Sequence, residues 1–247
     1  MSENQLLITT QNKGLFLYDF KNAMPWETEA NTFIKKNSSL GGVLVKDRFI
    51  VLNSVLNGII ICDTNGKIIQ HINHKKGLQN NTVLTSFIDK SKNIWLGLDN
   101  GIAFVNDNSP FTYFGFSYDI STVYASVVHK GNLYVATNQG VFYHSWNIPF
   151  QEGNFSLVEG TTGQTWNIQS IDGQLLCANN NGALLIEENR TVKILDSNGY
   201  FSFKKIPNDP NHIVGANYNG FAIFEKNSSG WKFLNQISGF DKPSNSF

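Results

Sequence analysis

The sequence has no excess charge, little cysteine and no long apolar run. Its 19 lysines and arginines balance 19 aspartates and glutamates, so no overall field would attract nucleic acid or an anionic membrane. Its two cysteines, Cys62 and Cys177, lie in no Cys-x-x-Cys or histidine-rich spacing, which excludes a disulfide framework and a recognisable zinc site. No segment approaches the roughly 18 apolar residues that cross a bilayer, and no signal peptide opens the chain. We therefore expect a soluble segment without membrane insertion or nucleic-acid binding, in which both cysteines are core residues.

The residues that are abundant describe strands and turns. Aromatic residues make up 13% of the chain, with 19 phenylalanines, and there are 21 glycines among its 247 residues. Aromatic residues favour strands, while glycine and asparagine favour the turns that join them. The composition therefore predicts an all-β fold.

One hairpin pattern recurs through the whole chain. A β-forming run, a short polar turn that ends in glycine and a second apolar run appear six times, spaced 38 to 44 residues apart. Four of the six turns are Asn-Gly, the pair best suited to the positive φ angles of a tight hairpin. The turn glycines are Gly14, Gly58, Gly101, Gly140, Gly182 and Gly220.

Further β-forming runs precede and follow most of these hairpins. Runs before the hairpin lie at residues 83–89, 123–129, 165–172 and 200–206, and runs after it lie at 67–72, 111–116, 155–159, 192–195 and 231–237. Four short antiparallel strands in a repeat of about 40 residues have the dimensions of a propeller blade. A β-sandwich or a β-solenoid fits less well, because neither repeats one hairpin at this period.

The sequence thus predicts a β-propeller of about six four-stranded antiparallel blades within one domain over 1–247. The six repeat units are residues 5–40, 41–76, 77–118, 119–160, 161–198 and 199–241. The first unit lacks a run for its innermost strand, and the chain stops where another blade would begin. We therefore expect an incomplete ring or a fragment of a larger propeller, although six units can also close into a small ring. Residues 24–36 fit an extended segment or loop as well as a helix.

The third unit resembles a known family. Its residues 77–106 carry Gly77 and Leu78 at the opening turn, an Asp89, Asn93 and Trp95 core, and the Asn-Gly hairpin turn. This pattern resembles the two-component regulator propeller repeat, and the other units keep the strand spacing and the hairpin glycine. The resemblance implies the sensor domain of a membrane-anchored, Bacteroidetes-type hybrid two-component or helix-turn-helix transcription regulator. Such sensors face the periplasm and often track glycans.

The chain offers little for catalysis or metal binding. Its histidines lie in no metal-binding spacing, no Gly-x-Ser-x-Gly is present, and most acidic residues fall at turns, where their side chains cap the backbone. The histidines are His71, His74, His129, His144 and His212. We therefore predict no catalytic residue, no metal site and no cofactor. We also expect Trp95 to pack between neighbouring blades.

The candidate ligand site lies at the loops that enter the innermost strands. Trp166 has the same position in its strand as Leu84 and Tyr124 have in theirs, so its ring can border the central channel. Uncharged amides and hydroxyls beside aromatic rings suit a neutral, polyhydroxylated ligand, although they also suit ordinary turns and, for Trp166, core packing. The candidate residues are Asn80, Asn81, Thr122, Tyr124, Thr165, Trp166 and Tyr200.

The leading hypothesis is an extracytoplasmic, periplasmic sensor segment of a bacterial signalling or transcription regulator, without catalysis of its own. The expected partners are a glycan or another neutral small ligand, the rest of the parent protein, and a second copy paired through open blade edges. A polysaccharide lyase or glycoside hydrolase is the first alternative, which clustered acids or a His-Tyr pair at the channel mouth would favour. A purely structural blade array for protein interaction is the second.

Overall fold

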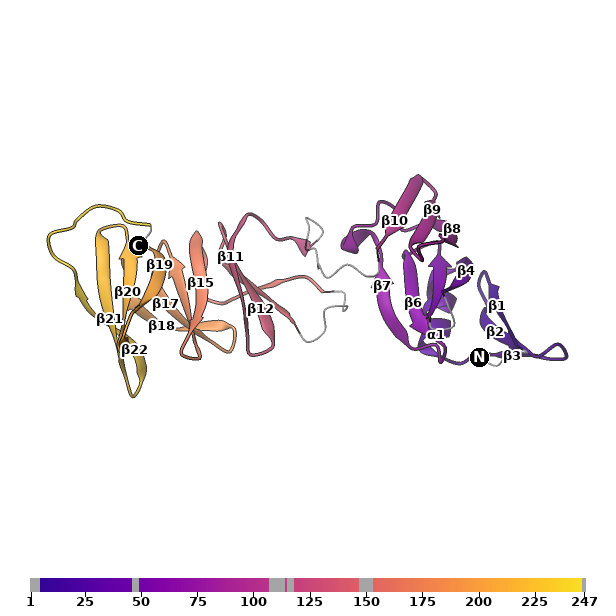
Figure 1. Cartoon of the computed structure of the whole chain (residues 1–247), viewed down its shortest axis with the longest axis horizontal. Helices are drawn as coiled ribbons and strands as arrows, with labels where there is room; N and C mark the ends of the chain where they lie inside the picture. Colours follow the sequence, from indigo (N-terminus) through magenta and orange to yellow (C-terminus); the bar gives the residue numbers. More distant parts are fainter. Residues whose placement is uncertain (1–4, 46–48, 107–113, 115–117, 147–152, 246–247) are drawn as a thin grey trace. The chain divides into compact units, whose positions relative to one another are not determined.

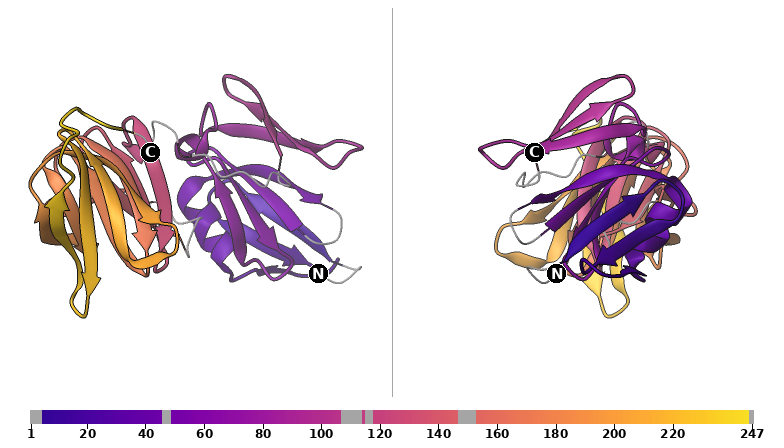
Figure 2. Two further views of the ribbon diagram at one scale, coloured as in Figure 1. Left: turned by 60° about the vertical axis from the view of Figure 1, so that its left-hand side comes forward. Right: turned by 90° about the vertical axis from the view of Figure 1, so that its right-hand side faces the viewer.

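The computed structural model describes residues 5–45, 49–106, 114, 118–146 and 153–245. Among these residues the fold is all-β with one α-helix, as the composition predicts. The chain divides into two compact units, residues 1–117 and 118–247. Each unit contains three antiparallel sheets that follow one another in chain order (Figure 1), and Figure 2 shows them from two further directions.

The N-terminal unit contains a sheet of three strands, one of four and another of three. Each strand pairs with the next along the chain, so every sheet is a meander. The first sheet is β1 (Leu6–Thr10), β2 (Gly14–Tyr18) and β3 (Ala23–Pro25). The second is β4 (Ser39–Val45), β5 (Phe49–Ser54), β6 (Ile59–Asp63) and β7 (Ile68–Ile72). The third is β8 (Val83–Ile88), β9 (Ile94–Leu98) and β10 (Gly101–Val105).

The C-terminal unit contains three sheets of four strands with the same meander order. The fourth sheet is β11 (Val123–His129), β12 (Asn132–Thr137), β13 (Val141–Ser145) and β14 (Ser156–Leu157). The fifth is β15 (Thr165–Ile171), β16 (Gln174–Asn179), β17 (Gly182–Glu187) and β18 (Arg190–Asp196). The sixth is β19 (Tyr200–Ile206), β20 (Asp209–Asn217), β21 (Gly220–Asn227) and β22 (Gly230–Gln236).

The six predicted hairpins are all present, one in each sheet. Each turn glycine has a positive φ, from 73° at Gly58 to 152° at Gly182, a region that side chains with a Cβ rarely adopt. At Gly58 a Cβ would also lie 2.1 Å from the carbonyl oxygen of Ile72. Backbone geometry and close approach therefore both require glycine at this turn.

Most of the flanking strands also form where the sequence predicts them. The predicted run 111–116 lies almost wholly outside the described residues, so β8 to β10 are the described strands of the third sheet. Each repeat unit contains one sheet, except that β4 begins at Ser39, two residues before its predicted unit. Whether the six sheets form a single domain, and whether they close into a ring, stay predictions.

Residues 24–36 form a helix over part of their length. The sequence did not decide between a helix, an extended segment and a loop for these residues. Helix α1 (Glu29–Asn37) begins because the Thr28 hydroxyl accepts the Asn31 backbone N–H at 3.2 Å. Glu29 in the first turn and Lys35 in the last complement the helix dipole. The buried Asn31 accepts the backbone N–H of Leu15 at 2.7 Å, which ties the helix to β2.

The middle sheet of each unit is buried on both faces. In β5, Ile50 and Leu52 pack toward the first sheet, while Val51 packs toward the third. In β16, Leu175 packs toward the fourth sheet and Leu176 toward the sixth. This burial explains why β5 and β16 contain continuous apolar runs, whereas β9 of the third sheet alternates between buried and more exposed residues.

Both cysteines lie inside these cores, as the sequence predicts. Cys62 belongs to the cluster between the first and second sheets, and Cys177 to that between the fourth and fifth. Both are free thiols with no exposed surface. Burial raises the pKa of each thiol to about 12.

We expect neither thiol to react with Ellman's reagent in the native protein near neutral pH. The thiolate is the reactive species, and burial both suppresses it and blocks access of the reagent. In guanidinium chloride both thiols should react at once, which supplies the positive control. Fast reaction of either cysteine in the native protein would contradict its burial.

Candidate functional site

A β-bulge recurs near the start of the first strand in five sheets. We call β4, β8, β11, β15 and β19 the leading strands, since they occupy the position predicted for innermost strands. In each leading strand the first residue pairs with the neighbouring strand, the second residue has no partner there, and the pairing resumes at the third residue. A bulge frees one side chain from the alternation of the strand and changes its direction. The bulged residues are Leu40, Leu84, Tyr124, Trp166 and Phe201.

In the C-terminal unit all three bulged residues are aromatic, and their rings meet. The Tyr124 and Trp166 centroids are 5.2 Å apart, and those of Trp166 and Phe201 are 5.6 Å apart. Tyr218, in the turn after β20, follows at 4.8 Å from Phe201. We call these four residues the aromatic row. It crosses three sheets at the same end of their leading strands.

Hydrogen bonds fix the rings of the aromatic row. The Trp166 indole N–H donates to the Tyr218 hydroxyl at 3.0 Å, and the Gln164 amide donates to the Tyr124 hydroxyl at 3.1 Å. Tyr124 is 43% exposed, and the other three rings are half-buried. Within the described part of the chain, the row has hydrogen bonds and ring contacts only with uncharged side chains.

Polar, uncharged turn residues adjoin the row. The backbone N–H of Asn180 donates to the Gln164 carbonyl at 2.8 Å, and the Asn180 side chain is exposed. Asn219, which follows Tyr218, is exposed as well. Aromatic faces beside amides can stack on the apolar face of a ligand and hydrogen bond to its hydroxyl groups.

The structure brings together part of the predicted site. Tyr124 and Trp166 lie side by side in the aromatic row, and Thr122 is exposed two residues before Tyr124. The equal position predicted for Leu84, Tyr124 and Trp166 is confirmed, because all three are the bulged residues of their strands. The expectation that Trp166 borders a central channel stays a prediction.

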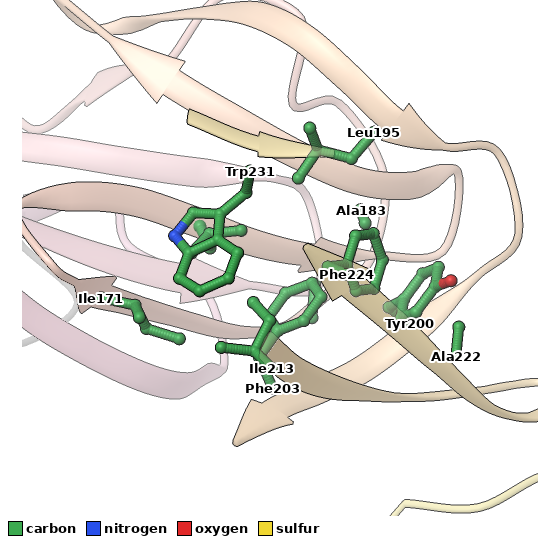
Figure 3. Close-up of a cluster of buried hydrophobic side chains, with 11 residues drawn as sticks. Ile171, Ala183, Leu195, Tyr200, Phe203, Ile213, Ala222, Phe224 and Trp231 are labelled. Atoms are coloured by element: carbon green, nitrogen blue, oxygen red, sulfur yellow. The ribbon is translucent and has the colours of Figure 1, made fainter. Parts of the chain in front are cut away.

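Thr165 and Tyr200 are buried and serve the fold. The Tyr200 hydroxyl donates to Asp196 Oδ2 at 2.6 Å, while its ring packs on Phe203 and Phe224. Figure 3 shows Tyr200 within this apolar cluster. The Thr165 hydroxyl accepts the side-chain amide of Asn179 at 2.9 Å. Neither side chain can reach a ligand in solvent, so we do not keep them in the proposed surface.

Asn80 and Asn81 belong to the N-terminal unit and shape its turns. Asn80 Oδ1 accepts the backbone N–H of Thr82 at 2.8 Å, and Asn81 Oδ1 accepts that of His74 at 2.7 Å. The bulged residue next to them is Leu84, which is exposed but not aromatic. Phe201 and Tyr218 complete the row instead, and the sequence analysis missed both.

Three of the residues that carry the family resemblance are joined by hydrogen bonds across the turn between β8 and β9. Asp89 Oδ2 accepts the indole N–H of Trp95 at 2.9 Å and the side-chain amide of Asn93 at 3.0 Å. These two bonds lower the pKa of the Asp89 carboxyl. Trp95 packs against Phe104 on the face of the third sheet that points away from the second sheet. The expectation that Trp95 packs between neighbouring blades stays a prediction, because the fourth sheet belongs to the other unit.

A cleft of about 360 Å³, which we call the His129 cleft, lies between the fourth and fifth sheets, at the opposite end of β11 from Tyr124. His129 and Tyr134 lie there with the carboxylates of Glu187 and Glu188. The Tyr134 hydroxyl donates to Asn189 at 2.6 Å, and His129 Nδ1 lies 3.1 Å from the Ser170 hydroxyl. Burial, with a contribution from Lys130, lowers the pKa of His129. This histidine is therefore neutral near pH 7.

Among the residues that the structure describes, no group of three or more His, Cys, Asp and Glu side chains is arranged to hold a metal ion. No helix in the described part of the chain is long and apolar enough to cross a membrane.

No protein-family model and no curated protein sequence matches the chain. Solved structures do match. The extracellular domain of the hybrid two component system BT4673 from B. thetaiotaomicron is 16% identical, over 98% of this chain and 37% of that one, with a TM-score of 0.43. That of BT3049 from the same organism is also 16% identical, over 97% and 39%, with a TM-score of 0.36. The WD40 β-propeller domain of Doa1 is 11% identical, over 83% and 71%, with a TM-score of 0.36.

The first two matches are extracellular domains of hybrid two component systems. The chain spans less than two fifths of the length of either one. At these identities and TM-scores we transfer neither a function nor a residue role from any of the three structures.

Proposed function

We propose that this chain is a ligand-binding segment of a periplasmic sensor in a bacterial signalling or transcription regulator, and that it has no catalysis of its own. The aromatic row of Tyr124, Trp166, Phe201 and Tyr218 carries the proposal. It offers ring faces and amides without charged contacts among the described residues, which suits a neutral ligand with an apolar face, such as a glycan. The resemblance of residues 77–106 to a sensor repeat supports the signalling role.

The bulged backbone supports this use of the row. Strand pairing holds the backbone before and after each bulged residue. The three sheets therefore each hold one ring of the row in place, and none of these rings belongs to the buried core clusters. A ligand stacked along the row would replace water on ring faces that are already in position. Such preorganisation reduces the entropy cost of binding.

We expect Trp166→Ala to weaken binding of a neutral oligosaccharide at least tenfold, about 1.4 kcal/mol. Trp166 contacts two of the other three rings and bonds to the third, so its loss removes a stacking face and the support of Tyr218. Isothermal titration with cello-, xylo- and manno-oligosaccharides would measure the effect. Circular dichroism would verify that the variant is folded.

Trp146→Ala is the matched control. Trp146 is 39% exposed and bonds through its backbone N–H to Gly131, at the opposite end of β11 from Tyr124. Its removal should leave the affinity unchanged. If the wild-type protein binds no member of a broad panel of neutral glycans, or if both variants lose affinity equally, the proposal is wrong.

The His129 cleft favours one alternative to the sensor function, which is the cleavage of a polysaccharide. A neutral histidine beside a tyrosine and two carboxylates contains groups that could exchange protons with a substrate. The same panel, analysed for released products, tests whether the chain hydrolyses neutral glycans. Turnover that disappears in His129→Ala would establish an enzyme and overturn the sensor-only proposal.

A further inference from the structure

A glutamine of β22 holds the turn that carries Tyr218. Tyr218 lies between Asn217, the last residue of β20, and Asn219. Gln236, the last residue of β22, contacts both of these flanking residues. Its Oε1 accepts the side-chain amide of Asn217 at 3.0 Å, and its own amide donates to the Asn219 carbonyl at 2.9 Å. The Gln236 side chain therefore bridges the two residues on either side of Tyr218.

This bridge pairs a polar group that has no access to water. Asn217 has no exposed surface, and its Oδ1 accepts the backbone N–H of Asn219 at 2.8 Å. Buried amides need hydrogen-bond partners, and the amide of Asn217 finds its partner in Gln236. Asn179, which has the same place at the end of β16, instead donates to the carbonyl of Thr161, before its leading strand. The sixth sheet thus holds its turn from the side of β22.

The chain that follows β22 passes over the same turn. We call residues 237–244 the covering segment. The Ser244 backbone N–H donates to the Asn217 carbonyl at 3.1 Å. A Cβ at Gly220, the residue after the turn, would collide with the Phe240 carbonyl oxygen. The covering segment therefore lies directly on the backbone that carries Tyr218.

The turn also places Tyr218 in the aromatic row. The Tyr218 ring lies 4.8 Å from that of Phe201, and its hydroxyl accepts the Trp166 indole N–H at 3.0 Å. A binding group keeps its geometry only when the residues behind it are fixed by their own hydrogen bonds. Loss of the Gln236 bridge would loosen the turn, displace the Tyr218 ring and leave the Trp166 indole with a poorer acceptor.

We propose that Gln236 is a positioning residue of the aromatic row, and that ligand binding at the row stabilises the covering segment. This inference rests on the proposed function. Coupling between two sites is reciprocal, so a turn that must be ordered for binding is itself stabilised when the row is occupied. The hydrogen bond from Ser244 to that turn is stabilised with it. Occupancy of the row is thereby transmitted to residues 237–244, which gives the sensor a route for its signal.

Gln236→Leu removes both hydrogen bonds while keeping a side chain of similar size. We expect it to weaken oligosaccharide binding about fivefold, the net value of about one hydrogen bond. Isothermal titration with cellotetraose, xylotetraose and mannotetraose would measure the effect. Gln169→Leu is the matched control, because Gln169 is also half-buried and donates to the Phe203 carbonyl at 2.8 Å, further along β15 from Trp166. The control should leave the affinity unchanged.

Two further measurements distinguish positioning from a general effect on folding. Tyr218→Ala should weaken binding, and adding Gln236→Leu to it should cause no further loss, because the glutamine acts through the tyrosine. In the wild type, a saturating tetrasaccharide should slow hydrogen exchange at the Ser244 amide. This second measurement needs no variant, so it tests the coupling even if Gln236→Leu does not fold.

The outcomes separate this inference from the proposed function. If no oligosaccharide binds the wild type, the proposed function is wrong and this inference is wrong as well. If binding depends on Trp166 but is equal in Gln236→Leu and wild type, the positioning role alone is wrong. Losses that add in the double variant would also overturn the positioning role. Unchanged exchange at Ser244 under saturation would overturn the coupling to the covering segment.

Discussion

Phe224→Ala should destabilise the C-terminal unit by about 3–5 kcal/mol, the usual cost of removing a buried phenylalanine ring. Phe224 has no exposed surface, and its ring lies within 6 Å of the rings of Tyr200, Phe203 and Phe233. Figure 3 shows Phe224 between the labelled Tyr200 and Trp231 in this cluster. Alanine would leave a cavity among aromatic groups that cannot collapse without losing their own contacts.

Urea unfolding followed by circular dichroism would measure this loss. Phe240→Ala is the matched control, because Phe240 is 47% exposed and contacts Phe221 at the surface. The control should shift the transition far less. Equal shifts for the two variants would show that the Phe224 cluster is not the core of this unit.

Asn179→Asp should cost about 3 kcal/mol or more at neutral pH, since it buries a charge without a countercharge. Asn179 is fully buried at the end of β16. Its side-chain amide donates to the Thr161 carbonyl at 3.0 Å and to the Thr165 hydroxyl at 2.9 Å. A carboxylate cannot donate these bonds and would face the carbonyl oxygen.

The cost should depend on pH with a defined sign. Burial raises the pKa of the introduced carboxyl in the folded state above its unfolded value of about 3.9. The penalty is therefore complete above the folded pKa and disappears as the pH falls below about 3.9. Asn180→Asp, at the exposed neighbour, should change stability by less than about 0.5 kcal/mol at any pH. A penalty at Asn179 that is constant with pH would contradict a buried-charge origin.

The hairpins could be predicted because their signal is local. Asn-Gly turns impose a backbone conformation within a few residues, and the six turn glycines do adopt positive φ. The repeat period then placed most strands correctly, including β8, β11, β15 and β19. No long-range contact had to be known for either step.

Only part of the candidate site was predicted, because the alternation of apolar and polar residues along a strand does not reveal a β-bulge. Each bulge adds a residue that shifts the faces of the strand, so in β19 the half-buried Phe201 joins the aromatic row while Tyr200 is buried. In β15 and β19 the residue before the bulge is buried, as Thr165 and Tyr200 show. Tyr218 was missed because it joins the row from a turn that is distant in sequence.

One hydrogen bond of Trp95 was also not predicted from the sequence. Its neighbours Ile94 and Leu96 are buried against the second sheet, so the alternation of β9 places the indole on the opposite face. Aromatic character alone predicted packing between blades, which stays a prediction. It did not indicate that the indole N–H donates to Asp89 and holds the turn between β8 and β9.

The repeated bulge separates the proposed ligand surface from the strand pairing that holds each sheet together. One backbone position holds leucine in two sheets and tyrosine, tryptophan or phenylalanine in the other three, while the ladder around it keeps the same register. A substitution there changes the chemistry of a surface without removing a strand pair. Under the proposed function, the ligand preference of the aromatic row would change one sheet at a time while the strand ladders keep their register.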